Sequence, residues 1–485
     1  MTQMNAGRPL VIFMLGTILV ACGGGGGGPT VAGIDGTGVL RASAFGTISA
    51  FGSVFVNGVR FETNNATFTI DGQVGSQSDL SVGDVVLVQG TIDSGGTTGT
   101  ADSVSFDDNV EGPISAIDPA AGTLVVLSQL IRVTANTSFD DSIQPASLDG
   151  LNVDDVVEVT GLVDAMGIID ATRLELKPAG GELEITGLVS MLNPGDSRFN
   201  INSLVVDFSS AMLEDFPSGS VSDNDLVEVK GNAIGNMGEL IATRVEFKGA
   251  RLDGDQDDRL EIEGFITRFS SASDFDVSGF PVTTNAQTRF EGGVEADLGL
   301  NVKVEVEGSR SASGVLVATE VDIRRARAVR VTALVDSVDA GTDSFVTLGI
   351  TVNVDVLTRI EDKSDLDLEP FGLAQLATGD YVEIRGTEFP AGSGQLLAGR
   401  LEREDPDPEA ILQGFVTDFA EPTITILGVT IETDGGTVFR DENDAVLSAT
   451  DFFAQLAQGS LVKAHGTEIS AQVIDADEVE LELEN

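Results

Sequence analysis

A short apolar segment closed by glycine recurs along the chain. Its first copy, Gly83 to Gly90, reads Gly-Asp-Val-Val-Leu-Val-Gln-Gly. The turn-forming Gly-Asp, the apolar run and the final Gly together predict a β-strand. Five similar segments follow, and the closing glycines of the six are Gly90, Gly161, Gly231, Gly308, Gly386 and Gly466. Because these glycines are 71, 70, 77, 78 and 80 residues apart, we infer one module in six copies.

Shorter patterns flank this strand at the same places in each module. The module opens with Gly-x-(Ile/Val)-(Ser/Thr/Asp)-x-apolar, as at Gly46, although Ala333 replaces the glycine in the fifth copy. A hairpin follows, and in the first copy it alternates apolar and polar residues around Asn57-Gly58, a strong type I′ turn pattern. Longer hairpins are expected at 124–133 and 199–208 in the second and third copies.

A variable segment then leads to the glycine-closed strand. In the sixth copy, residues 450–459 start with a capping residue and end with glycine, which predicts a short helix, and residues 373–379 carry a similar pattern. In the first copy, residues 79–82 leave room for barely one turn. Each module closes with Ala-x-x-apolar-x-apolar, as in Ala171 to Leu176, which predicts a last strand.

The predicted order is strand, two-stranded hairpin, short helix or loop, strand, strand. This is the order of the OB-fold, a small five-stranded Greek-key barrel, and a small β-sandwich with the same strand count is the alternative. We therefore expect an all-β chain, a tandem array of six small five-stranded OB-like barrels. The short linkers between them favour docked neighbours over free beads. The predicted modules, numbered one to six, are 45–109, 110–178, 182–249, 260–325, 328–404 and 410–485.

Composition narrows the classes of partner. Acidic residues outnumber basic ones 78 to 27, for a formal net charge of −51 over 485 residues. Such a surface repels phosphate backbones, so we expect no nucleic-acid partner. It suits cations, basic proteins, polysaccharide held through cations, or a saline medium, and solubility alone would also account for it.

The N-terminal segment predicts export and lipid anchoring. Residues 1–21 hold one charged side chain, Arg8, followed by an apolar run from Leu10 to Ala21 that is too short to span a bilayer. Leu-Val-Ala-Cys22 ends this signal peptide and resembles the lipobox of bacterial lipoproteins, with Cys22 as the lipidated residue. The Gly-rich residues 22–44 read as a flexible tether. Gly23, rather than Asp, resembles outer-membrane sorting, so the expected location is the cell envelope of a Gram-negative bacterium.

The strings in the first module carry a family resemblance. Gly-x-(Ile/Val)-Ser-x-Phe, Phe-x-Val-Asn-Gly-Val and Gly-Asp-x-Val-x-Val-x-Gly, all between Gly46 and Gly90, resemble a repeated domain of unknown function found in lipoproteins and secreted proteins of Gram-negative bacteria. The resemblance extends over about residues 45–485 and is closest in the first module. It implies no activity and no catalytic residues.

The residue types needed for catalysis are scarce. The one histidine, His465, lies in the sixth glycine-closed strand, and we interpret it as a barrel-face or edge residue. With one Cys and one His, a zinc site of the usual His/Cys type is nearly excluded by count. Carboxylate pairs arise everywhere among 78 acids, so they carry almost no specificity for acid–base catalysis. We therefore predict that the chain is not an enzyme and needs no organic cofactor.

One acidic cluster and one basic run stand out. Asp253, Asp255 and Asp257 alternate as at the start of a calcium loop, although Asp258 and Gly264 depart from the EF-hand pattern, and a solvated linker is the alternative. The run from Ile323 to Arg330 holds four arginines, which we interpret as a clasp to acidic neighbours.

Three functions follow as hypotheses. The first is a non-enzymatic envelope lipoprotein, a repeat-domain scaffold or spacer held at the membrane by its N-terminal lipid. The second is a calcium-dependent binder of envelope polysaccharide or of a basic protein. The third, more remote, is a hydrolase that uses a carboxylate pair buried in a cleft.

Overall fold

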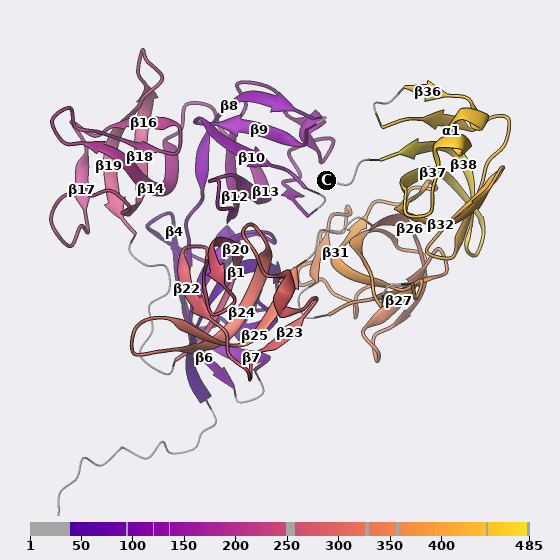
Figure 1. Cartoon of the computed structure of the whole chain (residues 1–485), viewed down its shortest axis with the longest axis horizontal. Coiled ribbons are helices and arrows are strands. Elements are labelled where there is room, and N and C mark those ends of the chain that lie inside the picture. Colours follow the sequence, from indigo (N-terminus) through magenta and orange to yellow (C-terminus); the bar gives the residue numbers. More distant parts are fainter. Residues whose placement is uncertain are drawn as a thin grey trace, which may run out of the picture. The chain divides into compact units, whose positions relative to one another are not determined.

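The described part of the chain is built almost entirely from strands. The computed structural model describes residues 39–93, 96–119, 121–134, 136–248, 258–324, 329–355, 358–390, 392–442 and 445–482. Within these residues no helix is long and apolar enough to cross a bilayer. The same strand order occurs six times, and Figure 1 shows the coloured part of the chain as short, curled sheets of arrows. The all-β, repeated-barrel prediction is confirmed.

Each copy supplies five barrel strands. The opening strands are β1 (Val39–Ala50), β8 (Val110–Asp118), β14 (Leu183–Asn193), β20 (Arg259–Ser271), β26 (Val329–Asp339) and β32 (Ala410–Ala420). The hairpin strands are β2 (Val54–Val56) and β3 (Val59–Glu62), β9 (Thr123–Val126) and β10 (Gln129–Arg132), β15 (Arg198–Ile201) and β16 (Leu204–Asp207), β21 (Asp274–Val277) and β22 (Phe280–Thr283), β27 (Ser344–Thr347) and β28 (Ile350–Asn353), and β33 (Thr423–Ile426) and β34 (Val429–Glu432).

The last two barrel strands of each copy form an antiparallel pair. The glycine-closed strands are β6 (Val85–Asp93), β12 (Val156–Val163), β18 (Leu226–Ile234), β24 (Lys303–Arg310), β30 (Tyr381–Glu388) and β37 (Leu461–Ser470). The closing strands are β7 (Thr98–Phe106), β13 (Ile169–Lys177), β19 (Leu240–Phe247), β25 (Leu316–Arg324), β31 (Leu396–Glu404) and β38 (Val473–Leu481).

Pairing closes these strands into barrels. In the first module β1 pairs antiparallel with β2 and β6, β2 with β3, and β6 with β7, while β3 runs parallel to β7. This closed circuit is that of the OB-fold and not of a two-sheet sandwich. Alternate residues point inward, so Ile48, Phe61 and Val88 are fully buried in the first barrel.

The closing glycine of the repeat is explained by a β-bulge. The register between the fourth and fifth barrel strands shifts beside Gly90, Gly308 and their counterparts. A Cβ on Gly308 would lie 2.2 Å from the carbonyl oxygen of Val317, and one on Gly90 would lie 2.0 Å from that of Thr100. Only a residue without a side chain permits this backbone approach, which is why glycine recurs there.

The smaller elements correct several expectations. Asn57 and Gly58 take the positive φ angles, 51° and 76°, of the predicted type I′ turn. The second and third modules use equally short turns, at Leu127 and Ser128 and at Asn202 and Ser203, so the longer hairpins predicted at 124–133 and 199–208 are wrong. The predicted helix of the sixth module is α1 (Ala449–Gln455), whereas residues 373–379 form turns and no helix.

Short strands that sequence patterns did not indicate precede the fourth barrel strand. They are β4 (Thr67–Ile70), β5 (Gln73–Gly75), β11 (Ser138–Phe139), β17 (Met212–Glu214), β23 (Arg289–Glu291), β29 (Arg359–Asp362), β35 (Val438–Arg440) and β36 (Val446–Leu447). Three-residue 3₁₀ turns lie at Gln77–Asp79, Leu148–Gly150 and Glu295–Asp297.

Strand pairing also joins whole modules. The opening strands β8 and β14 join modules two and three, and β26 and β32 join modules five and six, both antiparallel. Modules one and four, which are not neighbours in the chain, are joined by parallel pairing of β1 and β20. One hydrophobic core runs through modules two and three and another through modules five and six.

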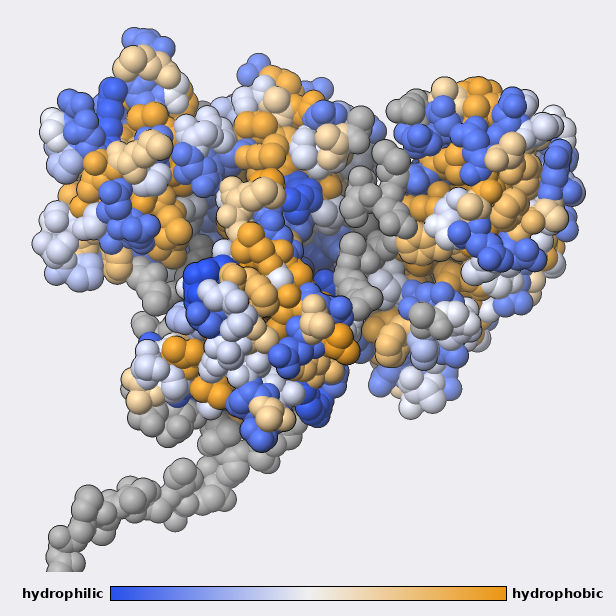
Figure 2. All heavy atoms as spheres, viewed as in Figure 1, coloured by the Kyte–Doolittle hydropathy of each residue, from blue (hydrophilic) through white to orange (hydrophobic). Residues whose placement is uncertain are grey.

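On the face shown in Figure 2, hydrophilic and hydrophobic residues are mixed over the modules.

Candidate functional site

A row of charged side chains crosses the junction between modules two and three. Glu158 on β12 lies opposite Glu111 on β8, and Glu111 lies opposite Glu184 on β14. Glu184 in turn lies opposite Lys230 on β18. Like charges directly opposite each other destabilise a sheet, so three adjacent glutamates need compensation from elsewhere.

Two aspartates from the first module complete the cluster. Asp71 sits at the turn between β4 and β5, and Asp108 lies in the connection from β7 to β8. The backbone N–H of Asp108 donates to Oδ1 of Asp71 at 3.3 Å, which ties the two together. We call Asp71, Asp108, Glu111, Glu158 and Glu184 the acidic junction, since modules one, two and three all contribute to it.

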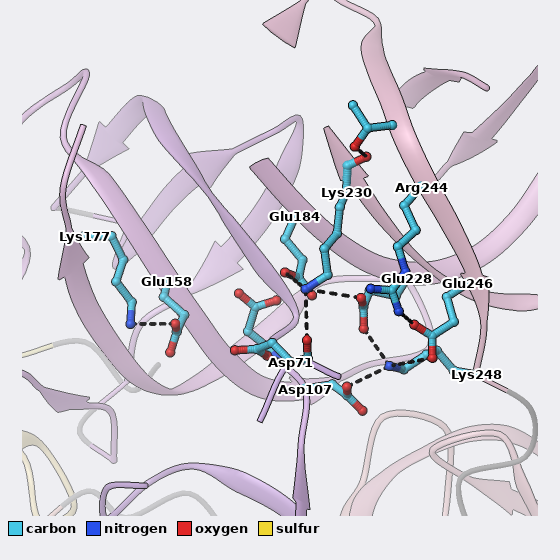
Figure 3. A network of polar contacts seen from close by, with 12 residues as sticks. Asp71, Asp107, Glu158, Lys177, Glu184, Glu228, Lys230, Arg244, Glu246 and Lys248 are labelled. Carbon is cyan, nitrogen blue, oxygen red and sulfur yellow. Dashed lines mark hydrogen bonds and ion pairs between the residues drawn. The ribbon is translucent and has the colours of Figure 1, made fainter. Parts of the chain in front are cut away.

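Two lysines neutralise part of this charge. Nζ of Lys230 lies 2.6 Å from Glu184, and Nζ of Lys177 lies 2.7 Å from Glu158 (Figure 3). Each lysine is shared with a carboxylate outside the junction, Glu228 at 3.3 Å for Lys230 and Glu175 at 2.8 Å for Lys177. Five carboxyl groups therefore share two lysines, and each lysine also contacts a carboxylate outside the junction.

Burial makes the excess charge costly. Asp108 is 1% exposed and Glu184 is 5% exposed. Burial, and then the nearby charge of Glu184, raise the pKa of Asp108 well above its usual value. Burial and Glu228 raise the pKa of Glu184 to about 8 although Lys230 opposes them, and burial raises that of Glu158 to about 7 against Lys177. At neutral pH these carboxyl groups therefore hold protons more readily than exposed ones do.

The carboxylate oxygens converge. Oxygens of Asp71, Asp108 and Glu184 lie within 4.8 Å of one another, and so do oxygens of Asp108, Glu111 and Glu158. Asp108 is common to both groups. Within the described residues, Oδ1 of Asp108 and Oε1 of Glu184 are buried without a hydrogen-bond partner. Buried carboxylate oxygens normally have a partner, so a bound ion or an ordered water would complete the coordination of these two.

The junction between modules five and six is balanced differently. Thr332 directly precedes the position of the opening glycine in module five, as Glu111 does in module two, yet Thr332 lies opposite the apolar Ile411. Farther along the same sheet, burial alone would raise the pKa of Glu383, but Arg385 and Arg330 overcome it and lower the pKa to about 2. The pair of facing glutamates is therefore absent from the junction of modules five and six, although single buried acids with raised pKa values, such as Glu261 and Glu404, occur elsewhere in the repeat.

Several residues singled out from sequence fall outside the described residues. These are Cys22 with its signal peptide and tether, and the candidate calcium ligands Asp253, Asp255 and Asp257. The structure leaves those predictions as they stand.

The remaining sequence candidates have structural partners. His465, in the middle of β37, has its Nδ1 3.2 Å from Oε1 of Glu409, the residue directly before β32. In the basic run, Arg324 pairs with Glu305 and Arg330 pairs with Glu383, as the clasp interpretation predicts, while residues 325–328 lie outside the described range.

The acidic junction escaped sequence reasoning although a signal was present. The position three residues before the closing glycine holds Glu158, Glu228, Glu305 and Glu383 in modules two to five. Six residues after the closing alanine stand Lys177, Lys248 and Arg324 in modules two to four. Each of these bases pairs with its module's glutamate. The signal in the sequence was a glutamate inside an otherwise apolar strand. The approach of Asp71 and Asp108 to these glutamates depends on how the modules dock and has no such signal.

Comparison with known proteins finds one family. The pattern of the Domain of unknown function (DUF5666) matches residues 45–105, 111–175, 263–322, 332–402 and 413–480. Module three is not among the matched segments, although β14 to β19 repeat the same strand order there. No curated protein matches the chain.

Proposed function

The chain belongs to the family described as Domain of unknown function (DUF5666), and we propose that it acts as a non-enzymatic repeat scaffold of the cell envelope, anchored by lipid at Cys22. The observation that carries this proposal is the strand pairing between modules. Backbone pairing of β8 with β14, β26 with β32 and β1 with β20 joins barrels that could otherwise move as beads. A chain joined in this way suits a role as a spacer or a multivalent platform.

Specific side-chain contacts support the same role. Arg400 donates from Nη1 to the carbonyl of Thr137 at 2.9 Å and so links modules five and two. The N–H of Thr47 donates to Glu263 at 2.9 Å and links modules one and four. Such buried bonds between distant parts of the chain oppose independent motion of the barrels.

The anchor is tested through Cys22. In a Gram-negative host, the parent chain should incorporate an alkyne-tagged fatty acid and fractionate with outer membranes. Cys22→Ser should lose both properties, while its circular dichroism spectrum should match that of the parent chain and so show that the variant is folded. Gly23→Asp should keep the label and move the protein to the inner membrane. Labelling of Cys22→Ser to the parent level would contradict the anchor.

The scaffold role is tested by measuring whether the chain binds a partner protein. We expect its exposed acidic surface to bind a basic probe protein, such as a cationic cytochrome, with an affinity that falls steeply as salt rises. The bonds by which Arg and Lys side chains join the modules should be unnecessary for that binding. Loss of binding in a fully folded Arg400→Lys variant would contradict a scaffold that binds the probe through its exposed charge alone.

A calcium-dependent binder of envelope polysaccharide is the second candidate. The net charge of −51 favours it, because an acidic protein meets an anionic polysaccharide through shared cations. Retention on a polysaccharide column in calcium, with elution by chelator, supports this candidate, and retention unchanged by chelator opposes it.

The carboxylate hydrolase is less well supported. Its hypothesis requires acids buried in a cleft open to substrate. The buried acids of the junction, Asp108 and Glu184, are 1% and 5% exposed between docked modules. A glycan could reach them only if the modules separated.

A further inference from the structure

We propose that the acidic junction is a calcium site, in which Asp108 is the central ligand and modules one, two and three are held together by the bound ion. The site differs from the alternating aspartates 253–257 in place and in kind. Its ligands come from three modules, and they are buried at Asp108 and Glu184 and half-buried at Asp71, Glu111 and Glu158.

The chemistry of the donors fits a hard divalent cation. All five side chains offer carboxylate oxygens, the ligands that Ca²⁺ prefers. Ca²⁺–oxygen distances are about 2.3–2.6 Å, so two oxygens on opposite sides of the ion lie about 5 Å apart. The oxygens of each group of three lie within 4.8 Å of one another, which allows such an ion between them with small side-chain movements.

Unsatisfied atoms give an independent reason. Oδ1 of Asp108 and Oε1 of Glu184 belong to side chains more than nine-tenths buried, and neither has a hydrogen-bond partner within the described residues. An orphaned buried carboxylate oxygen is costly, and an ion would satisfy both atoms at once. Lys230 already binds the other oxygen of Glu184, which leaves Oε1 available.

The arrangement also separates this site from ordinary acidic surface. Glu111 and Glu184 lie opposite each other between two modules, where the equivalent pair in modules five and six is Thr332 and Ile411. The repeat can therefore make the same junction without acids. Glutamates at these positions add charge to the junction and so allow docking to depend on a cation.

Calorimetry and melting on the whole mature chain test the proposal. The chain from residue 22, with Cys22→Ser to prevent lipidation, is stripped with chelator and titrated with CaCl₂, with MgCl₂ and with sodium chloride of matched ionic strength. We expect saturable heat with calcium and a rise in Tm of about 5 °C at a hundredfold excess over Kd, because ligand linkage stabilises the bound state. Magnesium and sodium should give much smaller rises.

Variants locate the ion. Asp108→Asn should lower the calcium affinity at least tenfold, and Asp149→Asn, which removes the same charge from an exposed position in module two, should leave it unchanged. If Asp108→Asn fails to fold by circular dichroism, Glu111→Gln at the half-buried edge of the junction provides the same comparison.

Several outcomes would overturn the proposal. One is a parent chain that gives no saturable heat when calorimetry follows its titration with calcium. The same holds for a parent chain whose Tm rises when the pH is lowered but not when calcium is added. Another is equal binding of magnesium and calcium. A third is calcium binding that survives Asp108→Asn and Glu111→Gln but is lost when Asp253, Asp255 and Asp257 are all changed to Asn, which would place the ion in that segment instead.

Discussion

Glu111 and Glu184 lie directly opposite each other across the antiparallel pairing of β8 and β14 that joins modules two and three. The pairing brings two carboxyl groups together where the backbone itself fixes the distance, and both are charged only above the pKa of about 8 for Glu184. Lys230 relieves one of them, through its contact with Glu184 at 2.6 Å. Above that pH the two carboxylates repel each other, which substitutions that remove one charge should reveal.

Neutralising one of the pair should stabilise the cation-free chain. We predict that, at a pH above the pKa of about 8 for Glu184, Glu111→Gln raises the local free energy of unfolding by about 0.5–1 kcal/mol in chelator, because a like-charge pair is removed. The measurement is hydrogen exchange of β8 and β14 peptides. Asp149→Asn should change their exchange by less than about 0.5 kcal/mol, as expected for an exposed site. Faster exchange in Glu111→Gln would contradict the repulsion.

The closing glycine should resist even alanine. We predict that Gly308→Ala destabilises the fourth module by about 2 kcal/mol or more, because its Cβ would lie 2.2 Å from the carbonyl oxygen of Val317. Hydrogen exchange of β24 and β25 peptides reports the change within that module. Gly299→Ala is the matched control, since its Cβ would approach Val302 no closer than 4.0 Å. Equal exchange in the two variants would remove the steric explanation of the repeat.

The arginine-rich side of the fifth module should be sensitive to acid. Burial would raise the pKa of Glu383, but Arg385 and Arg330 lower it to about 2 from 4.5, so the charged form stabilises the fold. That stability is fully present above about pH 5 and is lost as the pH falls toward 2. We predict that Glu383→Gln costs about 3 kcal/mol at pH 7 and progressively less below pH 4.5.

Hydrogen exchange of β30 peptides across this pH range measures the difference between Glu383→Gln and the parent. Comparing the two chains at each pH cancels the titration of the other acids. A difference that stays constant from pH 7 to pH 3 would contradict the lowered pKa.

Contacts between distant modules should be captured by a zero-length reagent. Nζ of Lys248 lies 2.8 Å from Asp107, and Nζ of Lys363 lies 3.0 Å from Asp141. We predict that a carbodiimide forms amide links between both pairs in the monomeric chain, identified by mass spectrometry. Lys248→Arg and Lys363→Arg should each abolish the corresponding link and leave the other in place. Links that form only between chains would contradict the docking of these modules.

The sequence predicted the barrels well because the repeat is local. A Gly-closed apolar strand, an Asn57-Gly58 turn and a closing alanine each act within one module, and six copies reinforce one another. Their order then left the OB-like circuit as the leading fold. The short strands such as β17 and β23 were missed, since they are only three residues long and pair with the closing strand from a variable segment.

Docking between modules was not predictable from the same patterns. The parallel pairing of Ala42 with Arg259 joins strands more than two hundred residues apart, and no periodicity in the chain encodes it. The acidic junction depends on the same step. Glu158 and Glu184 are visible as charges inside strands, but Asp71 reaches them only because its hairpin turn in module one meets modules two and three.

Anomalous diffraction tests the central claim most directly. Crystals of the chain from residue 22 are grown with calcium, the calcium is replaced by terbium, and an anomalous difference map is calculated. The account predicts a strong peak about 2.4 Å from a carboxylate oxygen of Asp108, within reach of Glu111 or Glu184. Peaks confined to exposed acidic loops or to residues 253–257, with none at Asp108, would contradict it.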